Sequence, residues 1–274
     1  MKIELDGPLL LVGAGKMGGA MLSGWLARGL DPADVIVVDP SPPPEMKDLL
    51  ARHGIRHEAA APELATAPAV ILMAVKPQVM DAVFAPLAAI AGPRTLVISI
   101  AAGRTIAGFE KHLRPGIAVI RTMPNTPAAI GRGITVCTCN KAADTRARAL
   151  CEALLSAVGD VGWVEDERLI DAVTAVSGSG PAYVFLLVEA LAAAGAKAGL
   201  DPALSMRLAR ATVSGSGELL HQSDLPAAEL RQNVTSPGGT TAAALGVLMG
   251  ADGLEPLMKK AVDAATRRGS ELAG

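Results

Sequence analysis

The glycine motif Gly13-Ala-Gly15-Lys-Met-Gly18 constrains the fold of this chain more than any other feature. It follows a short apolar run at 8–12 and leads into a segment at 20–28 with the composition of a helix. In such a strand–turn–helix unit, the first glycine permits the tight turn and the second lets a pyrophosphate approach the backbone. The third lets the helix pack on the strand, and free N–H groups at the helix start attract phosphate. The motif therefore predicts dinucleotide binding rather than an ordinary glycine turn.

The residue after the second predicted strand bears on which dinucleotide is bound. The strand at 35–38 ends at Asp39, roughly 20 residues beyond the motif, where a Rossmann unit places its ribose contact. A carboxylate there accepts hydrogen bonds from a ribose diol and repels a 2′-phosphate. Because no Arg or Lys lies between Asp39 and Met46, residue chemistry alone favours NADH. Two alternatives stay open: Ser41 could contact a 2′-phosphate, and Pro40 could turn the carboxylate away.

Composition narrows the class of protein. The 274 residues suit one large domain or two modest ones, with 50% hydrophobic, 19% charged and 2% aromatic residues. Such a surplus of aliphatic side chains indicates burial between subunits. The net charge of −2 gives no basic field for nucleic acid or an anionic membrane. Three cysteines form no disulfide framework, and the N-terminus does not read as a signal peptide, so we expect a cytoplasmic protein.

The first part of the chain alternates strands and helices. Its strands are almost continuously apolar, as in a parallel sheet that is buried on both faces. The pattern predicts an α/β fold with a doubly wound sheet. The expected strands are 8–12, 35–38, 69–75, 95–100, 116–121, 133–138 and 159–164, and the expected helices are 20–28, 45–52, 80–91, 105–113 and 144–157.

Strand signals stop after residue 164. The rest of the chain predicts helices separated by glycine and proline, at 169–176, 182–199, 202–220, 227–233, 241–249 and 254–272. We therefore expect a Rossmann dinucleotide-binding domain at 1–164 and an all-helical dimerisation and substrate domain at 165–274.

One predicted helix, at 183–196, is apolar on nearly every face. A helix of this kind must be surrounded by other apolar groups. It is short for a membrane span and carries Glu189, so we expect no membrane association. About a hundred residues could not easily wrap it, which favours a helix at the centre of an intertwined homodimer. A monomeric helical bundle is the alternative.

Three loops at the ends of predicted strands carry residues that the architecture alone does not need. These are 74–78 with Lys76, 99–103 with small residues, and 123–127 with Asn125 between two prolines. Ligands of open α/β sheets bind at the carboxyl edge, so these loops are candidates for cofactor contacts. Lys76 could instead be a solvated surface lysine, and Asn125 could belong to a plain turn.

Two loops of the helical part, 177–183 and 235–241, offer hydroxyls and backbone N–H groups at probable helix starts. Both suit a small carboxylate, although capping by Ser or Thr is the simpler role for each. Neither loop contains a His, Cys or Lys, which excludes a hydrolytic triad. Cys137 and Cys139 alternate on a strand without further ligands, so we expect no metal site.

Taken together, the segments GAGKMG, AVKP, SIAAG, MPNTP, VSGSGPAY and SPGGTT resemble the pyrroline-5-carboxylate reductase family, in family order from about residue 8 to about residue 270. The resemblance implies reduction of 1-pyrroline-5-carboxylate to L-proline, the last step of proline biosynthesis, with NADPH or NADH. It also implies an interlocked homodimer of Rossmann and helical domains, assembled in some members into decamers. We expect an active site that draws on both domains and on both chains.

The resemblance also implies residue roles. The expected cofactor contacts, which include Asp39, Ser41 and Asn125 from the residue chemistry above, are Val12, Gly13, Ala14, Gly15, Lys16, Met17, Asp39, Ser41, Ala74, Val75, Lys76, Pro77, Ala101, Ala102, Asn125 and Asn233. The expected substrate contacts are Glu167, Ser236, Gly238, Gly239, Thr240 and Thr241, with Thr241 and Glu167 as catalytic residues. Ala61 stands where some relatives have an Asn that contacts the ribose, which puts that contact in doubt.

This chemistry needs few reactive groups. If the imine arrives protonated, the enzyme need only orient its carbon against the nicotinamide. Glu167 could hydrogen-bond the ring nitrogen, or Glu165, Asp166 and Glu167 could simply favour a helix start. The family more often uses NADPH, so we expect both cofactors to work, with Asp39 weakening that preference. The alternatives are a β-hydroxyacid-dehydrogenase-type enzyme, for which Lys197 is the nearest candidate lysine, another imine reductase, or a non-catalytic NAD(P)-binding regulator.

Overall fold

The structure, a computed structural model, describes residues 3 and 5–273. The chain divides into two compact units: Met1–Gly178 with Ala265–Gly274, here called the sheet part, and Ser179–Ala264, here called the helical part. The predicted boundary after Val164 falls inside the sheet part and stays a prediction.

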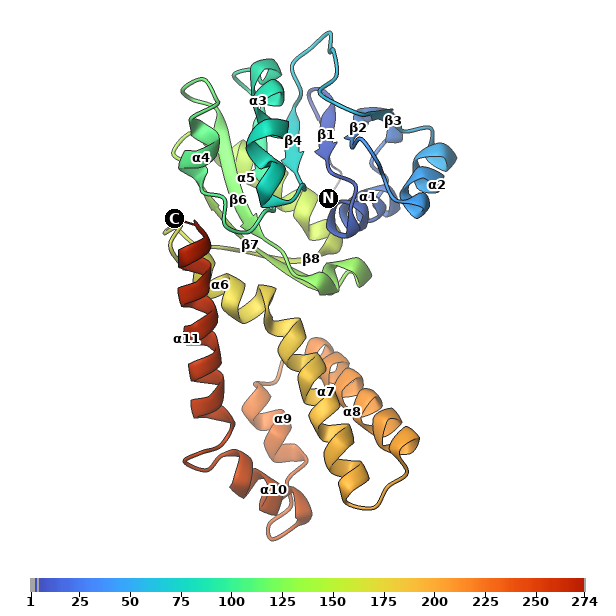
Figure 1. The fold of residues 1–274 in the computed structure, drawn as a ribbon, viewed down its shortest axis with the longest axis vertical. Helices are drawn as coiled ribbons and strands as arrows, with labels where there is room; N and C mark the ends of the chain where they lie inside the picture. The colour runs from blue at the N-terminus through green and yellow to red at the C-terminus, as the bar shows by residue number, and fades with distance from the viewer. Residues whose placement is uncertain (1–2, 4, 274) are drawn as a thin grey trace. The chain divides into compact units, whose positions relative to one another are not determined.

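The sheet part is built on one sheet whose described strands have the order β3-β2-β1-β4-β5-β6-β7-β8 (Figure 1). Neighbouring strands are parallel except β6 and β7. The order reverses at β1, where Val12 pairs with Val38 on one side and Met73 on the other. The strands are β1 (Leu9–Val12), β2 (Val35–Val38), β3 (Arg56–Glu58), β4 (Val70–Met73), β5 (Leu96–Ser99), β6 (Ala118–Met123), β7 (Gly133–Cys139) and β8 (Gly159–Trp163).

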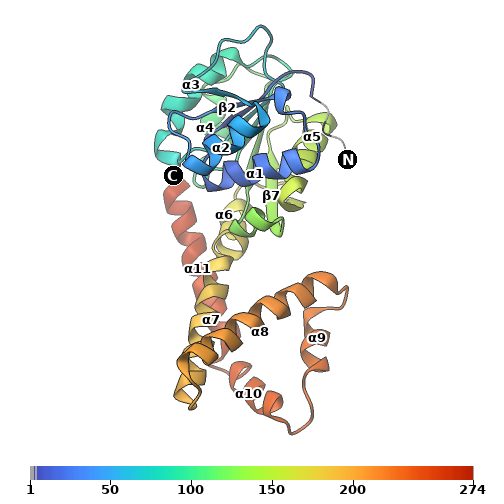
Figure 2. The same cartoon turned by 90° about the vertical axis from the view of Figure 1, so that its right-hand side faces the viewer.

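Helices cover both faces of this sheet. Leu9 and Leu11 point to one face, against Trp25 and Leu154, whereas Leu10 faces the opposite core. Figure 2 shows α3 and α4 on one side of the strands and α5 on the other. The helices of this part are α1 (Lys16–Ala27), α2 (Pro44–His53), α3 (Met80–Ile90), α4 (Ile106–Glu110), α5 (Thr145–Leu155) and α6 (Leu169–Val173), which continues as a π-helical turn at Thr174–Gly178.

The predicted α/β class is confirmed, and all seven predicted strands are present. The sequence interpretation missed β3. Its residues, Arg56, His57 and Glu58, are polar and at least partly exposed, so this edge strand has no apolar pattern. Backbone pairing with β2, rather than burial of side chains, defines it.

The helical part contains α7 (Gly180–Lys197), α8 (Pro202–Gln222), α9 (Ala227–Asn233), α10 (Thr240–Leu248) and the first half of α11 (Leu254–Ala273). Its buried residues are Ala192, Ser205 and Ala209. The Ser205 hydroxyl donates to the Ala192 carbonyl oxygen at 2.6 Å and joins α7 to α8. Gly195 permits this close packing, since a Cβ there would clash with the Ser205 hydroxyl.

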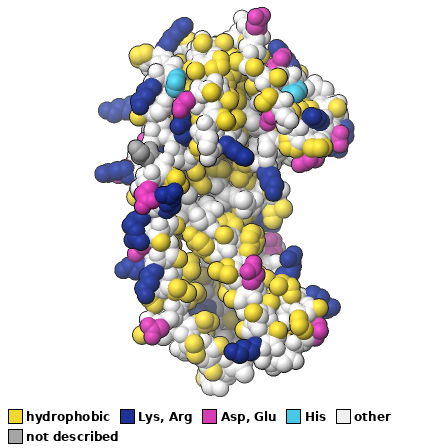
Figure 3. Space-filling view, viewed as in Figure 1, with side chains coloured by type: hydrophobic (Ala, Val, Ile, Leu, Met, Phe, Trp, Pro, Cys, Tyr) yellow, Lys and Arg dark blue, Asp and Glu magenta, His cyan; other side chains and the backbone are white. Residues whose placement is uncertain are grey.

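The apolar helix predicted at 183–196 lies in α7 and is largely exposed. Phe185 is 63% and Leu186 is 62% exposed, and Figure 3 shows apolar side chains spread over the visible face of the helical part. By length and composition alone, the run Leu169–Lys197 could cross a membrane, a test that interior helices of soluble proteins also pass. Among the described residues, none covers these exposed side chains of α7.

Candidate functional site

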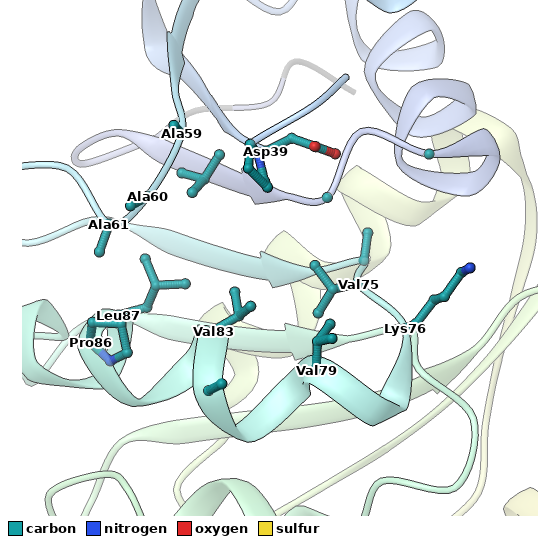
Figure 4. Close-up of a pocket in the computed structure, with 16 residues that line it drawn as sticks. Asp39, Ala59, Ala60, Ala61, Val75, Lys76, Val79, Val83, Pro86 and Leu87 are labelled. Carbon is teal, nitrogen blue, oxygen red and sulfur yellow. The ribbon is translucent and has the colours of Figure 1, made fainter. Parts of the chain in front are cut away.

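A cavity of about 520 Å³ lies at the carboxyl edge of β1, β2 and β4 (Figure 4). It therefore lies where the strand order reverses, the usual ligand position in open α/β sheets. Its lining comes from the glycine motif, the end of β2, the loop after β3, the end of β4 and α3: Gly13, Gly15, Val38, Asp39, Pro40, Ala59, Ala60, Ala61, Ala74, Val75, Lys76, Val79, Ala82, Val83, Pro86 and Leu87.

The three glycines of the motif have different tasks. Gly13 has φ +96°, and a Cβ there would lie 2.8 Å from the Ala74 carbonyl oxygen. A Cβ on Gly18 would clash with the Gly13 carbonyl, so Gly18 lets α1 pack closely. A Cβ on Gly15 would meet nothing within 4 Å. Gly15 therefore faces open space, as expected where a pyrophosphate approaches the backbone.

The start of α1 fits an anion. Gly15 is its N-cap, no side chain caps the helix, and its first turn holds no acid. Lys16 and Met17 form the first turn, beside free N–H groups that favour negative charge. The site therefore fits a dinucleotide, with the pyrophosphate at this end.

Asp39 points toward the glycine motif. One carboxylate oxygen accepts the Ala14 N–H at 2.7 Å, and the other accepts the Ser41 N–H at 2.8 Å. The Asp39 carbonyl oxygen accepts from His57 Nε2 at 2.7 Å, which fixes the turn from the far side. Pro40 thus does not turn the carboxylate away, and Ser41 contacts it through its backbone.

The opposite end of the cavity is apolar. Ala59, Ala60 and Ala61 face Val83, Pro86 and Leu87 of α3, with no side-chain hydrogen-bonding group among them (Figure 4). This shape suits the flat faces of an adenine ring. Ala61 offers no amide to a ribose, in line with the departure from the family pattern.

Other predicted cofactor residues are distributed as follows. Ala74, Val75 and Lys76 line the cavity, with Pro77 starting the next turn, while the Val12 side chain is buried in the sheet. Ala101 and Ala102 follow β5 at the same edge of the sheet but do not line this cavity. Asn125 accepts the Ile134 N–H at 2.9 Å through Oδ1, which supports a turn. Asn233 ends α9 in the helical part.

The loop 235–241 has the geometry of an anion cradle. Gly238 has φ +69°, and the Gly239 N–H donates to the Ser236 carbonyl oxygen at 3.0 Å. Gly239 is the N-cap of α10, and no side chain caps this helix. By contrast, α8 begins with Asp201, whose carboxylate accepts the Leu204 N–H. The first N–H groups of α10, beside Thr240 and Thr241, thus have no side-chain cap.

The loop 177–183 shows less of a ligand site. The Ser177 hydroxyl donates to the Val173 carbonyl oxygen at 3.0 Å within the π-helical turn. Ser179 precedes α7 and makes no capping hydrogen bond. The hydrogen bond of Ser177 is therefore local to its own helical turn, and neither Ser177 nor Ser179 shows the capping that the sequence interpretation offered as the alternative.

One carboxylate oxygen of Glu167 accepts two hydrogen bonds. Its Oε1 accepts Arg121 Nη1 at 3.0 Å and the Ile106 N–H at 2.9 Å, and its side chain is 29% exposed. Sequence reasoning missed Arg121, although the one charged residue of the strand at 118–123 was a visible signal.

Two of the three cysteines are shielded from solvent. Cys137 and Cys151 are fully buried, and burial raises the pKa of the Cys151 thiol well above its ordinary value. Within the described residues, no group of three His, Cys, Asp or Glu side chains could hold a metal ion.

Comparison with known proteins adds two family matches. Residues 167–272 match a family model described as pyrroline-5-carboxylate reductase dimerisation. Residues 9–103 match one described as NADP oxidoreductase, coenzyme F420-dependent. The two matches cover the helical part and the cavity-forming half of the sheet.

Individual relatives extend over the whole chain. A pyrroline-5-carboxylate reductase of Synechocystis sp. is 43% identical over 274 residues, 99% of each chain. The structure of a pyrroline-5-carboxylate reductase from Coxiella burnetii has a TM-score of 0.90 at 34% identity, covering 98% of this chain and 99% of that one. The Plasmodium falciparum pyrroline carboxylate reductase, solved with NADP bound, has a TM-score of 0.80 at 29% identity, with 98% and 99% covered.

Proposed function

The chain belongs to the pyrroline-5-carboxylate reductase family, and we infer its activity from that membership. It is an NAD(P)H-dependent oxidoreductase that reduces 1-pyrroline-5-carboxylate to L-proline by hydride transfer to the carbon of the cyclic imine. The observation that carries this conclusion is the dinucleotide cavity at the switch point of the sheet, in a chain similar to these reductases over its full length.

We propose that the sheet part holds the cofactor along the cavity. The α1 N–H groups beside Gly15 bind the pyrophosphate, and Asp39 accepts from the adenosine ribose. The apolar wall at Ala59–Ala61 receives the adenine. Lys76 and the loop with Ala101 and Ala102 extend the site toward the nicotinamide, which supplies the hydride when bound.

We propose that the helical part binds the substrate carboxylate. The uncapped N–H groups of α10, the hydroxyls of Ser236, Thr240 and Thr241, and the Gly238-Gly239 backbone form its cradle. Asn233, just before this loop, contributes to the cofactor side. The described loop contains no general acid, so its task is to hold the imine rather than to exchange protons with it.

Glu167 has a second oxygen for the substrate. Oε1 accepts from Arg121 and Ile106, while Oε2 accepts no hydrogen bond from any of the described residues, and the side chain is partly exposed. We propose that Oε2 accepts from the protonated ring nitrogen. A carboxylate in this place favours the cationic imine, whose carbon is the better hydride acceptor.

We propose a cytoplasmic homodimer, able to assemble further, built through the exposed apolar faces of the helical part. The family match of residues 167–272 and the exposure of Phe185 and Leu186 support the dimer. Burial against a second chain also gives α7 a role without a membrane.

The direct test is oxidation of NADH and of NADPH by the purified protein with 1-pyrroline-5-carboxylate, with L-proline measured in the same sample. We expect one proline for each reduced cofactor consumed. Cofactor binding without turnover would contradict the proposal and favour a non-catalytic regulator.

A further inference from the structure

Arg121 is a buried cation on β6, a strand whose other residues are uncharged. Its side chain is 4% exposed. Val119, two residues earlier on β6, and Val97 on β5 lie on the same face of the sheet. Its Nε is inaccessible to solvent and has no hydrogen-bond partner among the described residues. Burying a guanidinium with one donor unpaired is costly, so packing alone gives no reason for an arginine here.

Two carboxylates compensate this charge, and each also holds another segment. Glu167 Oε1 lies 3.0 Å from Arg121 Nη1 and accepts the Ile106 N–H at 2.9 Å. Asp171 Oδ1 lies 3.8 Å from Arg121 Nη2, and its Oδ2 accepts the Ser270 hydroxyl at 2.9 Å. Arg121 thus joins the start of α4 to the last turns of α11, both within the sheet part.

The loop that follows β5 leads into α4 and also lies against the last turn of α11. Gly103 in this loop has φ +70°, and a Cβ there would lie 3.3 Å from the Leu272 carbonyl oxygen of α11. At the other end of the loop, Ile106 is tied to Glu167. Arg104 forms an ion pair with Asp81 at the start of α3, and this guanidinium lowers the pKa of the Asp81 carboxyl. The loop is therefore tied to Asp81 and to Glu167, and at Gly103 it packs closely against α11.

We propose that Arg121 is a positioning residue for the cofactor, acting through Glu167 and Asp171 on the loop 101–105. The inference rests on the proposed cofactor contacts of Ala101 and Ala102. By fixing two carboxylates at once, Arg121 sets the distance between α6 and the loop, so that the loop is ordered before the cofactor arrives. Preorganisation of this kind raises affinity because less freedom is lost on binding.

The test compares Glu167→Ala with Glu167→Gln. Glutamine keeps an acceptor oxygen for Ile106 and Arg121, whereas alanine removes it. Hydrogen exchange of the Ile106 amide and NADH affinity are measured without substrate, so the proposed contact of Glu167 with the ring nitrogen does not enter. We expect Glu167→Ala to lose the amide protection and to raise the Kd for NADH about tenfold, and Glu167→Gln to stay within about threefold of the unchanged protein.

Two further variants separate positioning from general stability. Ser270→Ala removes the hydroxyl on Asp171 and should raise the NADH Kd about threefold, whereas Ser23→Ala, on the exposed side of α1, should change nothing. Arg121→Lys keeps the charge without the fork of donors, and we expect a Kd between those of Glu167→Gln and Glu167→Ala.

The outcomes are distinguishable. Lost Ile106 protection with unchanged NADH affinity in Glu167→Ala overturns the inference, as do equal effects of alanine and glutamine. An unchanged protein that fails to bind either NADH or NADPH contradicts the proposed function instead.

Discussion

The sheet part and the helical part use apolar residues in opposite ways. In the sheet part, Leu10 and Ile71 are completely buried between the strands and their covering helices. On α7 of the helical part, Phe185 and Leu186 are more than half exposed. The sheet part buries its apolar side chains within itself, whereas the helical part leaves those of α7 exposed. This difference fits our proposal that most of the cofactor site lies in a part that folds around its own core, whereas the helical part needs a second chain.

Each part contains a helix whose first N–H groups have no side-chain cap. Both α1 and α10 begin after a glycine with no side-chain cap, whereas α5 and α8 begin with an aspartate that accepts a backbone N–H. Leaving N–H groups unpaired is tolerated where an anion occupies them. We therefore expect the pyrophosphate at one of these helix starts and the substrate carboxylate at the other.

The largest effect should come from a charge in the exposed face of α7. Phe185→Asp places a carboxylate in each half of the expected interface, where an unpaired charge costs several kcal/mol. We expect a monomer with at least about 100-fold lower turnover, while NADH still binds to the sheet part. Ala89→Asp, on the exposed side of α3, is the control and should remain a dimer. An active dimer of Phe185→Asp would break the comparison.

The next prediction compares two glycines of the sheet part, Gly18 for stability and Gly15 for cofactor binding. Gly18→Ala forces a methyl against the Gly13 carbonyl, and we expect a loss of about 3 kcal/mol in the free energy of unfolding, measured in urea. Gly15→Ala adds a methyl in open space. It should keep the melting temperature but raise the NADH Kd about tenfold. Similar losses of stability in both variants would contradict the separate roles of the two glycines.

A smaller change in the helical part should affect the substrate alone. Thr241→Ala removes a hydroxyl beside the expected carboxylate, and hydrogen bonds to charged groups contribute about 1.5–3 kcal/mol. We expect KM for 1-pyrroline-5-carboxylate to rise about 30-fold with cofactor affinity unchanged. If both affinities fell together, the loop would be a structural element and not the carboxylate cradle.

The smallest effect should be a shift in cofactor preference. Asp39→Ser should raise kcat/KM for NADPH relative to NADH about fivefold, because the carboxylate that repels a 2′-phosphate is gone. Asp39→Asn removes the same charge and keeps an acceptor for Ala14 or Ser41, so it should shift the ratio in the same direction. Asp48→Asn, on the exposed side of α2, is the matched control for net charge. An unchanged ratio in both Asp39 variants would mean that Asp39 does not face the ribose.

Much of the fold follows from local patterns. Continuous apolar strands and glycine or proline punctuation located the parallel sheet and the helices, because burial on both faces leaves a strong signal. The edge strand β3 left no such signal, since its residues are polar and its ladder with β2 is formed by the backbone. The uncapped starts of α1 and α10 were foreseeable from glycines at the right spacing.

Contacts between residues far apart in the sequence could not be predicted from local patterns. No spacing rule connects Arg121 with Glu167, which lie 46 positions apart, or Asp171 with Ser270, which lie 99 apart. The orientation of Asp39 likewise depends on the Ala14 N–H, supplied by a different segment. Sequence patterns identify which residues meet a ligand more readily than which residues hold those residues in place.

The most direct test of the contrast between the two parts is the mass of the active species. Light scattering and turnover are measured on the same sample, at assay concentration and after serial dilution. The account predicts a dimer or an assembly of dimers, with turnover that falls as monomer forms while NADH binding persists. A monomer with full turnover would contradict it.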